Sequence, residues 1–281
     1  MHVPTMKIVR RTARHSHLVV ILLLAQPALA AAPADVWSAI DAKRVCPTAS
    51  VWRLGVGPGR TPFDVIETVV PLEVDGRPVW RITHTQLRGP EDLRKGTTPG
   101  FDFFDVDRAT LAPQQSEHHT AGRADAPAKA TRFEYLPGSV RRLNDDGSVA
   151  ETIALEVGQR LIADGPGAAI INQGVKWSDG LKLRGYMMDR WRGTERERVR
   201  EVELSVTGRS AVEIDGRRVE TFVVVEEPVD GAYKLTSQIT VARPHLHVHV
   251  QYVANAKRPD ARAFVSEVTS IMASGSCRES G

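Results

Sequence analysis

Cysteine is nearly absent from this sequence, which contains only Cys46 and Cys277. Two cysteines are too few for a disulfide-rich scaffold, so a hydrophobic core must stabilise the fold. They nevertheless form an even pair, and such a pair usually bridges in an oxidising compartment. We therefore expect a Cys46–Cys277 disulfide, with two free thiols near the chain ends as the alternative.

Long apolar runs are lacking as well. The longest uninterrupted run, Leu18–Ala25, has eight residues, too few to cross a bilayer core about 30 Å thick as a stable anchor. It follows a basic segment and precedes Ala28-Leu29-Ala30, the order typical of a secretory signal peptide. The sequence predicts a signal peptide over residues 1–30 and, over 31–281, a single antiparallel β domain that is periplasmic or secreted and has no membrane span. A retained N-terminal anchor is the alternative.

No strong excess of either charge remains after that cleavage. The whole chain has 37 Lys and Arg against 34 Asp and Glu, a formal net charge of +3. Four of the basic residues and none of the acidic ones lie in residues 1–30, which leaves 33 basic and 34 acidic side chains. A nucleic-acid-binding protein keeps a basic excess, so we expect no nucleic-acid partner.

The common catalytic motifs are missing. The sequence contains no Gly-x-Ser-x-Gly, His-Glu-x-x-His, Walker loop or Gly-x-Gly-x-x-Gly. Both cysteines lie near the ends, a poor place for a catalytic thiol. We therefore assign no catalytic residue and no cofactor, and favour a binding protein over an enzyme, although a carboxylate pair would leave little trace in one sequence.

Asp-Gly, by contrast, is frequent, and four of its six occurrences separate alternating apolar and polar runs. These four are Asp75-Gly76, Asp146-Gly147, Asp215-Gly216 and Asp230-Gly231. Asp and Gly tolerate the positive φ of a two-residue hairpin turn, so each pair predicts a β-hairpin. A short helix is expected within Ala34–Arg44. The fold class is therefore mainly β, a curved antiparallel sheet or half-barrel with a few short helices.

Two runs alternate strictly and define candidate binding residues. Their apolar members are Val202, Leu204 and Val206 in the first run, and Leu246, Val248 and Val250 in the second. Because successive side chains of a strand point to opposite faces, we expect both sets to line the concave face together.

The same alternation places His245, His247 and His249 on the opposite face of the second run. Imidazoles about 6.6 Å apart on one face could bind a metal ion such as zinc, with a further ligand from elsewhere in the chain. The candidates for that ligand are His84, His118 and His119. We favour the other interpretation, in which the histidines form the polar face of an amphipathic strand, because no carboxylate or cysteine at ligand spacing accompanies them.

Acidic residues cluster in the run Phe101–Asp107, which carries Asp102, Asp105 and Asp107. Carboxylates at this density could bind calcium, but the spacing and the turn glycine of a known calcium loop are missing. A strand that ends in a turn is the alternative.

The segment Asp107-Arg-Ala-Thr-Leu-Ala-Pro113 resembles an Asp-x-x-Thr-Leu-x-Pro segment in a family of exported proteobacterial proteins of unknown function. Val206-Thr207-Gly208, Val212–Gly216 and Pro244–Val248 resemble later segments of the same family, so the resemblance covers roughly Val51 to Ile271. It implies the half-barrel of the periplasmic lipoprotein carriers (LolA/LolB-like), in which a curved sheet wraps a hydrophobic cavity. It implies no catalytic residues.

Two functions follow from these observations. The first is a periplasmic binding or carrier module for an apolar ligand, a lipid or acyl chain, in the concave face of a half-barrel. The second is a metal-binding envelope protein or enzyme that uses the histidine strand. We favour the first, which requires a continuous apolar lining with room for the ligand.

Overall fold

The structure is a computed structural model. It describes residues 32–56, 62–89, 94, 96–122, 128–163, 165–189, 198–254 and 264–272. The predicted signal peptide over residues 1–30 and Cys277 lie outside these ranges.

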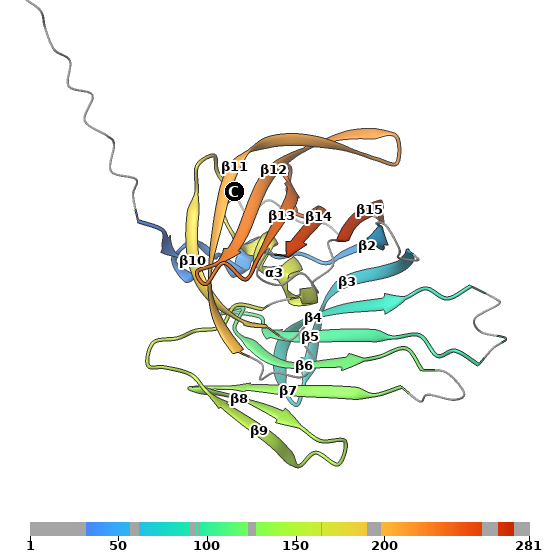
Figure 1. Ribbon diagram of the computed structural model, residues 1–281, viewed down its shortest axis with the longest axis vertical. Helices are drawn as coiled ribbons and strands as arrows, with labels where there is room; N and C mark the ends of the chain where they lie inside the picture. Colours follow the sequence, from blue (N-terminus) through green and yellow to red (C-terminus); the bar gives the residue numbers. More distant parts are fainter. Residues whose placement is uncertain are drawn as a thin grey trace, which may run out of the picture. The chain divides into compact units, whose positions relative to one another are not determined.

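Fifteen strands of the described chain form one open sheet in the order β1-β10-β11-β12-β13-β14-β15-β2-β3-β4-β5-β6-β7-β8-β9. Their bounds are β1 Ala34–Asp35, β2 Thr48–Val56, β3 Phe63–Val74, β4 Arg77–Gln86, β5 Phe101–Asp107, β6 Pro113–His119, β7 Ala130–Leu136, β8 Ser139–Leu143, β9 Val149–Ala154, β10 Lys182–Asp189, β11 Arg198–Ile214, β12 Arg217–Pro228, β13 Tyr233–Thr240, β14 His247–Ala254 and β15 Phe264–Met272. All neighbouring strands are antiparallel except β1 and β10. The mainly β, curved antiparallel fold is confirmed (Figure 1).

The four hairpins predicted from Asp-Gly are confirmed. They join β3 to β4, β8 to β9, β11 to β12 and β12 to β13. At Asp75-Gly76 both residues have positive φ, 51° and 73°, and at Asp215-Gly216 the values are 49° and 71°. A two-residue turn of this type matches the twist of the flanking strands, which explains why a local sequence signal sufficed.

The helices of the described chain are short. The segment expected to be helical contains α1 (Val36–Ala39) and the 3-10 turn η1 (Ala42–Arg44); α3 (Ala168–Gly174) follows the 3-10 turn η2 (Gly165–Gly167). In Figure 1, α3 lies among the strands rather than on an outer surface. None of the described helices is long and apolar enough to cross a membrane.

The main hydrophobic core surrounds α3. Ile170 and Ile171 of α3 belong to one buried cluster with Ile82 of β4, Phe104 of β5 and Val224 of β12. Strands distant in the sheet order therefore meet through this helix. The curvature of the sheet encloses α3, and this arrangement positions the candidate site.

A second hydrophobic cluster includes the end of the long β11–β12 hairpin (Figure 1). The strand pairing shifts between Val206 and Gly208, and such a bulge bends a hairpin. Near the turn, Ile214 is buried in one cluster with Trp52, Val248 and Val268. The hairpin end thus packs against residues of β2, β14 and β15.

Candidate functional site: the polar contacts of α3

Helix α3 lies unusually close to the sheet because it starts and ends at glycines. A Cβ atom on Gly167 would lie 2.5 Å from Cβ of Ala163 and 3.1 Å from Cγ of Phe104. A Cβ on Gly174 would lie 2.9 Å from Cδ1 of Leu111. Real Cβ atoms do not approach other atoms as closely as 2.5 or 2.9 Å, and 3.1 Å is tighter than most real Cβ contacts, so the glycines allow the helix to fit between the strands.

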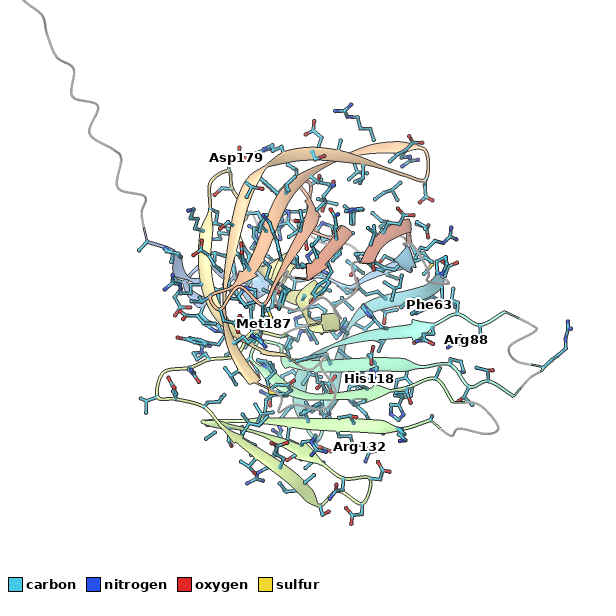
Figure 2. All side chains as sticks on the ribbon, in the orientation of Figure 1. Phe63, Arg88, His118, Arg132, Asp179 and Met187 are labelled. Atoms are coloured by element: carbon cyan, nitrogen blue, oxygen red, sulfur yellow. The ribbon has the colours of Figure 1, made fainter. Side chains whose placement is uncertain are left out.

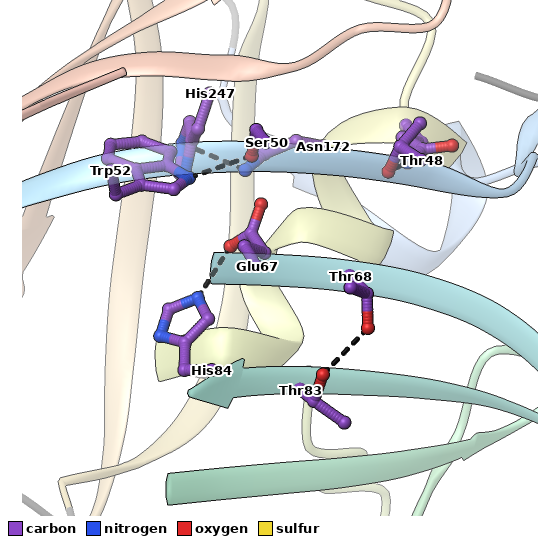
Figure 3. A network of polar contacts seen from close by, with 10 residues as sticks. Thr48, Ser50, Trp52, Glu67, Thr68, Thr83, His84, Asn172 and His247 are labelled. Carbon is purple, nitrogen blue, oxygen red and sulfur yellow. Dashed lines mark hydrogen bonds and ion pairs between the residues drawn. The ribbon is translucent and has the colours of Figure 1, made fainter. Parts of the chain in front are cut away.

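Two adjacent amide side chains tie the end of α3 to the sheet. The Gln173 side chain, 1% exposed, accepts a hydrogen bond from the Cys46 backbone N–H at 2.8 Å and donates one to Thr48 Oγ1 at 3.3 Å. The Asn172 Nδ2 donates to Nε2 of His247 at 2.8 Å (Figure 3). We call Cys46, Thr48, Asn172, Gln173 and His247 the α3 socket.

The imidazole of His247 is neutral at neutral pH. Burial, opposed only in part by the charge of Glu67, lowers the pKa of His247 to about 4. A neutral ring has one acceptor nitrogen, and Nε2 fills that role for Asn172. The socket therefore joins α3 to β14 through an uncharged amide–imidazole pair.

A small cavity of about 30 Å³ lies beside the socket. Its apolar lining includes Met187 on β10 (Figure 2) and Leu204 on β11, and its polar lining includes Glu226, Ser237 and His247. His247 is only partly buried. A cavity of this volume holds about one water molecule. The rest of the interior is filled by α3 and the side chains around it.

A larger groove of about 190 Å³ is open to solvent near β1 and β10. Its charged groups already have partners: Arg184 lies 3.5 Å from Glu201, and the Arg160 guanidinium stacks 4.2 Å over the Trp37 ring. The α3 socket is the stronger candidate because it borders the enclosed interior and an unpartnered polar side chain, Ser237.

The three histidines of the metal hypothesis do not come together. His245 precedes β14, and its Nδ1 donates to the Thr240 carbonyl at 2.9 Å while Nε2 lies 2.9 Å from Nη2 of Arg44. His247 binds Asn172, and His249 lies opposite Gln238. The described residues contain no group of three or more His, Cys, Asp or Glu side chains placed to hold a metal ion.

The three histidines expected to add a metal ligand are instead paired with carboxylates of the sheet. Nε2 of His84 lies 2.6 Å from Oε2 of Glu67 (Figure 3). His118 on β6 (Figure 2) contacts Asp102, and His119 contacts Glu117. Because Glu67, His84, Asp102 and His118 are successive register partners, these pairs form a polar row across four strands.

The six residues expected to form one apolar lining belong to two buried clusters. Val202, Leu204 and Val206 belong to the core around α3. Val248 is buried in the separate cluster at the hairpin end, against which the partly buried Leu246 and Val250 pack. The two sets therefore pack in different clusters, and a common lining of the concave face stays a prediction.

A β-bulge changes the face on which His247 lies. The β13–β14 register shifts between Gln238 and Ile239, so Ser237 pairs with Val250 and Ile239 with His247. Because Ser237 and Ile239 lie on one face of β13, Val250 and His247 share a face although three positions separate them. His247 thus lines the interior beside Leu204, whereas strict alternation placed it opposite.

Cys46, 6% exposed, connects the predicted disulfide to the socket through its N–H bond to Gln173. No free cysteine occurs in the described chain, but Cys277 lies outside it, so the pairing stays a prediction. We expect Cys277→Ser to lower the free energy of unfolding by about 2–5 kcal/mol. Urea denaturation measures this, and labelling of the denatured, unreduced protein must find no thiol; two labelled thiols would contradict the bridge.

The low pKa of His247 predicts a specific acid sensitivity. A histidine in the unfolded chain titrates near pH 6.5, so between about pH 6.5 and 4 the unfolded state binds more protons and stability falls as pH falls. At pH 4.5 the titration of His247 should lower the free energy of unfolding by about 2–3 kcal/mol relative to pH 7. Urea denaturation at pH 7 and 4.5 should show a smaller acid loss for His247→Gln than for the wild type; an equal loss contradicts the assignment.

Comparisons with known proteins assign no family to this chain. No family model matches the chain, and no curated protein matches it. A solved structure that does match is a β-barrel-like protein of the domain of unknown function DUF1849 from Brucella abortus, with 10% identity, a TM-score of 0.48, and coverage of 82% of this chain and 98% of that one. The resemblance to the lipoprotein carriers stays a prediction.

Proposed function

We propose that this protein is an exported binding or carrier protein whose apolar ligand, a lipid or acyl chain, enters the half-barrel in place of α3. The observation that carries the proposal is the position of α3: a short helix inside the sheet, surrounded by apolar side chains and tied at its C-terminal end by the side chains of Asn172 and Gln173.

The size of α3 supports an exchange of helix for ligand. Ligand pockets are typically 300–1,000 Å³, and the present cavity of about 30 Å³ is far smaller. A seven-residue helix is about 10 Å long and about 10 Å wide, which corresponds to a volume on the order of 800 Å³. Removal of α3 therefore exposes a site of the required size.

The chemistry of the exposed walls suits an apolar ligand. Ile82, Phe104 and Val224 are less than 5% exposed and contact the α3 cluster. Without a replacement these side chains would meet water when α3 leaves, at a cost of roughly 25 cal/mol per Å² of apolar surface. A lipid chain covers them again, so ligand binding and α3 displacement are coupled.

This coupling gives the test. Gln173→Ala removes both Gln173 hydrogen bonds. It should therefore destabilise the closed state, in which α3 lies inside the half-barrel, by about 1–2 kcal/mol. The apparent affinity for a neutral apolar probe, 1-N-phenylnaphthylamine, should then increase about 5- to 30-fold. Probe fluorescence measures the affinity. Gln159→Ala is the control, since Gln159 makes a comparable bond to the Glu156 N–H in an exposed loop.

The outcomes separate the alternatives. Thr48→Val, which removes one of the two Gln173 partners, should tighten binding in the same direction but less. Equal affinity in the wild type and Gln173→Ala contradicts displacement of α3. Absence of probe binding in every variant contradicts the binding function itself.

Export is part of the proposal and rests on the order of segments in residues 1–30. N-terminal sequencing of the protein recovered from a bacterial periplasm should begin at Ala31. A membrane-bound protein that keeps Met1 or Met6 contradicts it.

A further inference from the structure

We propose that the ligand of the α3 site carries a neutral, hydrogen-bonding head group, an amide or a hydroxyl, which binds Ser237 and His247. The inference rests on the proposed function and names the ligand class. It follows from three features of the cavity wall: a hydroxyl without a partner, an imidazole acceptor and, among the described lining residues, the absence of a basic side chain.

Ser237 is the first feature. It lies on β13, is 2% exposed, and lines the cavity. Its Oγ has no hydrogen-bond partner, although buried hydroxyl groups are normally paired. An unpaired buried hydroxyl that borders a cavity is a group to which a ligand can bind.

His247 is the second feature. Its Nε2 accepts from the carboxamide of Asn172, and this contact is lost when α3 leaves. The incoming ligand must then supply an N–H or O–H in place of the Asn172 amide. In the closed state α3 thus presents to His247 the same neutral donor that we assign to the ligand.

Charge is the third feature. The cavity lining contains the carboxylate Glu226, to which the Tyr233 hydroxyl donates at 2.7 Å, and no Lys or Arg among the described lining residues. Burial keeps the imidazole of His247 uncharged, with a pKa of about 4. An ionised carboxylate or phosphate head would lose its hydration without gaining a cation, so the wall disfavours fatty acids and phospholipid phosphates.

The test compares ligands that share a dodecanoyl chain and differ in the head group. Dodecanamide and dodecanoate are each used at pH 8 to displace 1-N-phenylnaphthylamine from the exported protein. We expect dodecanamide to bind at least about tenfold more tightly, with monododecanoylglycerol close to the amide. Equal or tighter binding of dodecanoate overturns this inference and leaves the binding function standing; displacement by none of the three contradicts the binding function.

Ser237→Ala tests the contact itself. We expect dodecanamide affinity to fall about three- to tenfold, while the thermal midpoint is unchanged or higher because an unpaired polar atom is removed. Ser266→Ala is the matched control, since Ser266 is a buried serine of β15 that does not line the cavity. Unchanged dodecanamide affinity in Ser237→Ala would refute a role for Ser237 in binding the head group.

Discussion

Arg81→Ala should lower the free energy of unfolding by about 3–5 kcal/mol, because it leaves a buried carboxylate without its cation. Asp105 is fully buried. Its two oxygens accept from Nε and Nη2 of Arg81 at 2.7 and 2.6 Å, and Gln115 Nε2 donates at 2.8 Å. The hydrogen bonding between Arg81 and Asp105 also raises the pKa of Arg81. Urea denaturation at pH 7 measures the loss.

Arg53→Ala is the matched control for this prediction. Arg53 also pairs with an aspartate of a neighbouring strand, Asp64, at 3.0 Å, but the two side chains are 48% and 35% exposed. Exposed pairs contribute little to stability because water and salt screen them, so we expect a much smaller loss than for Arg81→Ala. If both variants lose the same stability, the burial of Asp105 does not have the effect assigned to it.

The acidic run shows why such a pair escapes sequence analysis. Asp102, Asp105 and Asp107 suggested calcium or a strand that ends in a turn, and the structure has the strand. Asp107 Oδ1 accepts from the backbone N–H groups of Ala109 and Thr110 in the turn after β5. Asp105 instead meets Arg81, 24 positions away, and no local pattern connects the two residues.

The hairpins were predictable because their information is local. Asp75-Gly76 and Asp215-Gly216 adopt positive φ at adjacent residues, and this requirement alone restricts the residue types. The strands that flank them then pair by proximity in the chain. The neighbour relation of β15 and β2 has no such signal, since the two strands lie at opposite ends of the sequence.

The candidate site was only partly visible in the sequence. The Asn172-Gln173 pair follows Ile170-Ile171, but nearby glycine and proline residues obscure the helical pattern of this segment. Their partners Thr48 and His247 are far away in the chain. The bulge that turns His247 toward the interior depends on strand pairing, which alternation in one strand does not reveal.

Val248→Asp tests the burial of Val248 in the cluster at the end of the β11–β12 hairpin. Val248 is 1% exposed and packs with Trp52, Val268 and Ile214, so a carboxylate there would lose its water without gaining a partner. We expect a loss of several kcal/mol, enough to unfold a domain of ordinary stability, about 5–15 kcal/mol.

The control for Val248→Asp lies on the same strand. Val253, 45% exposed, has the same side chain, and Val253→Asp should change stability by less than about 1 kcal/mol because its carboxylate stays in water. Far-UV circular dichroism in a urea series compares the two variants. A folded Val248→Asp protein with the stability of Val253→Asp would show that the end of the β11–β12 hairpin does not seal this cluster.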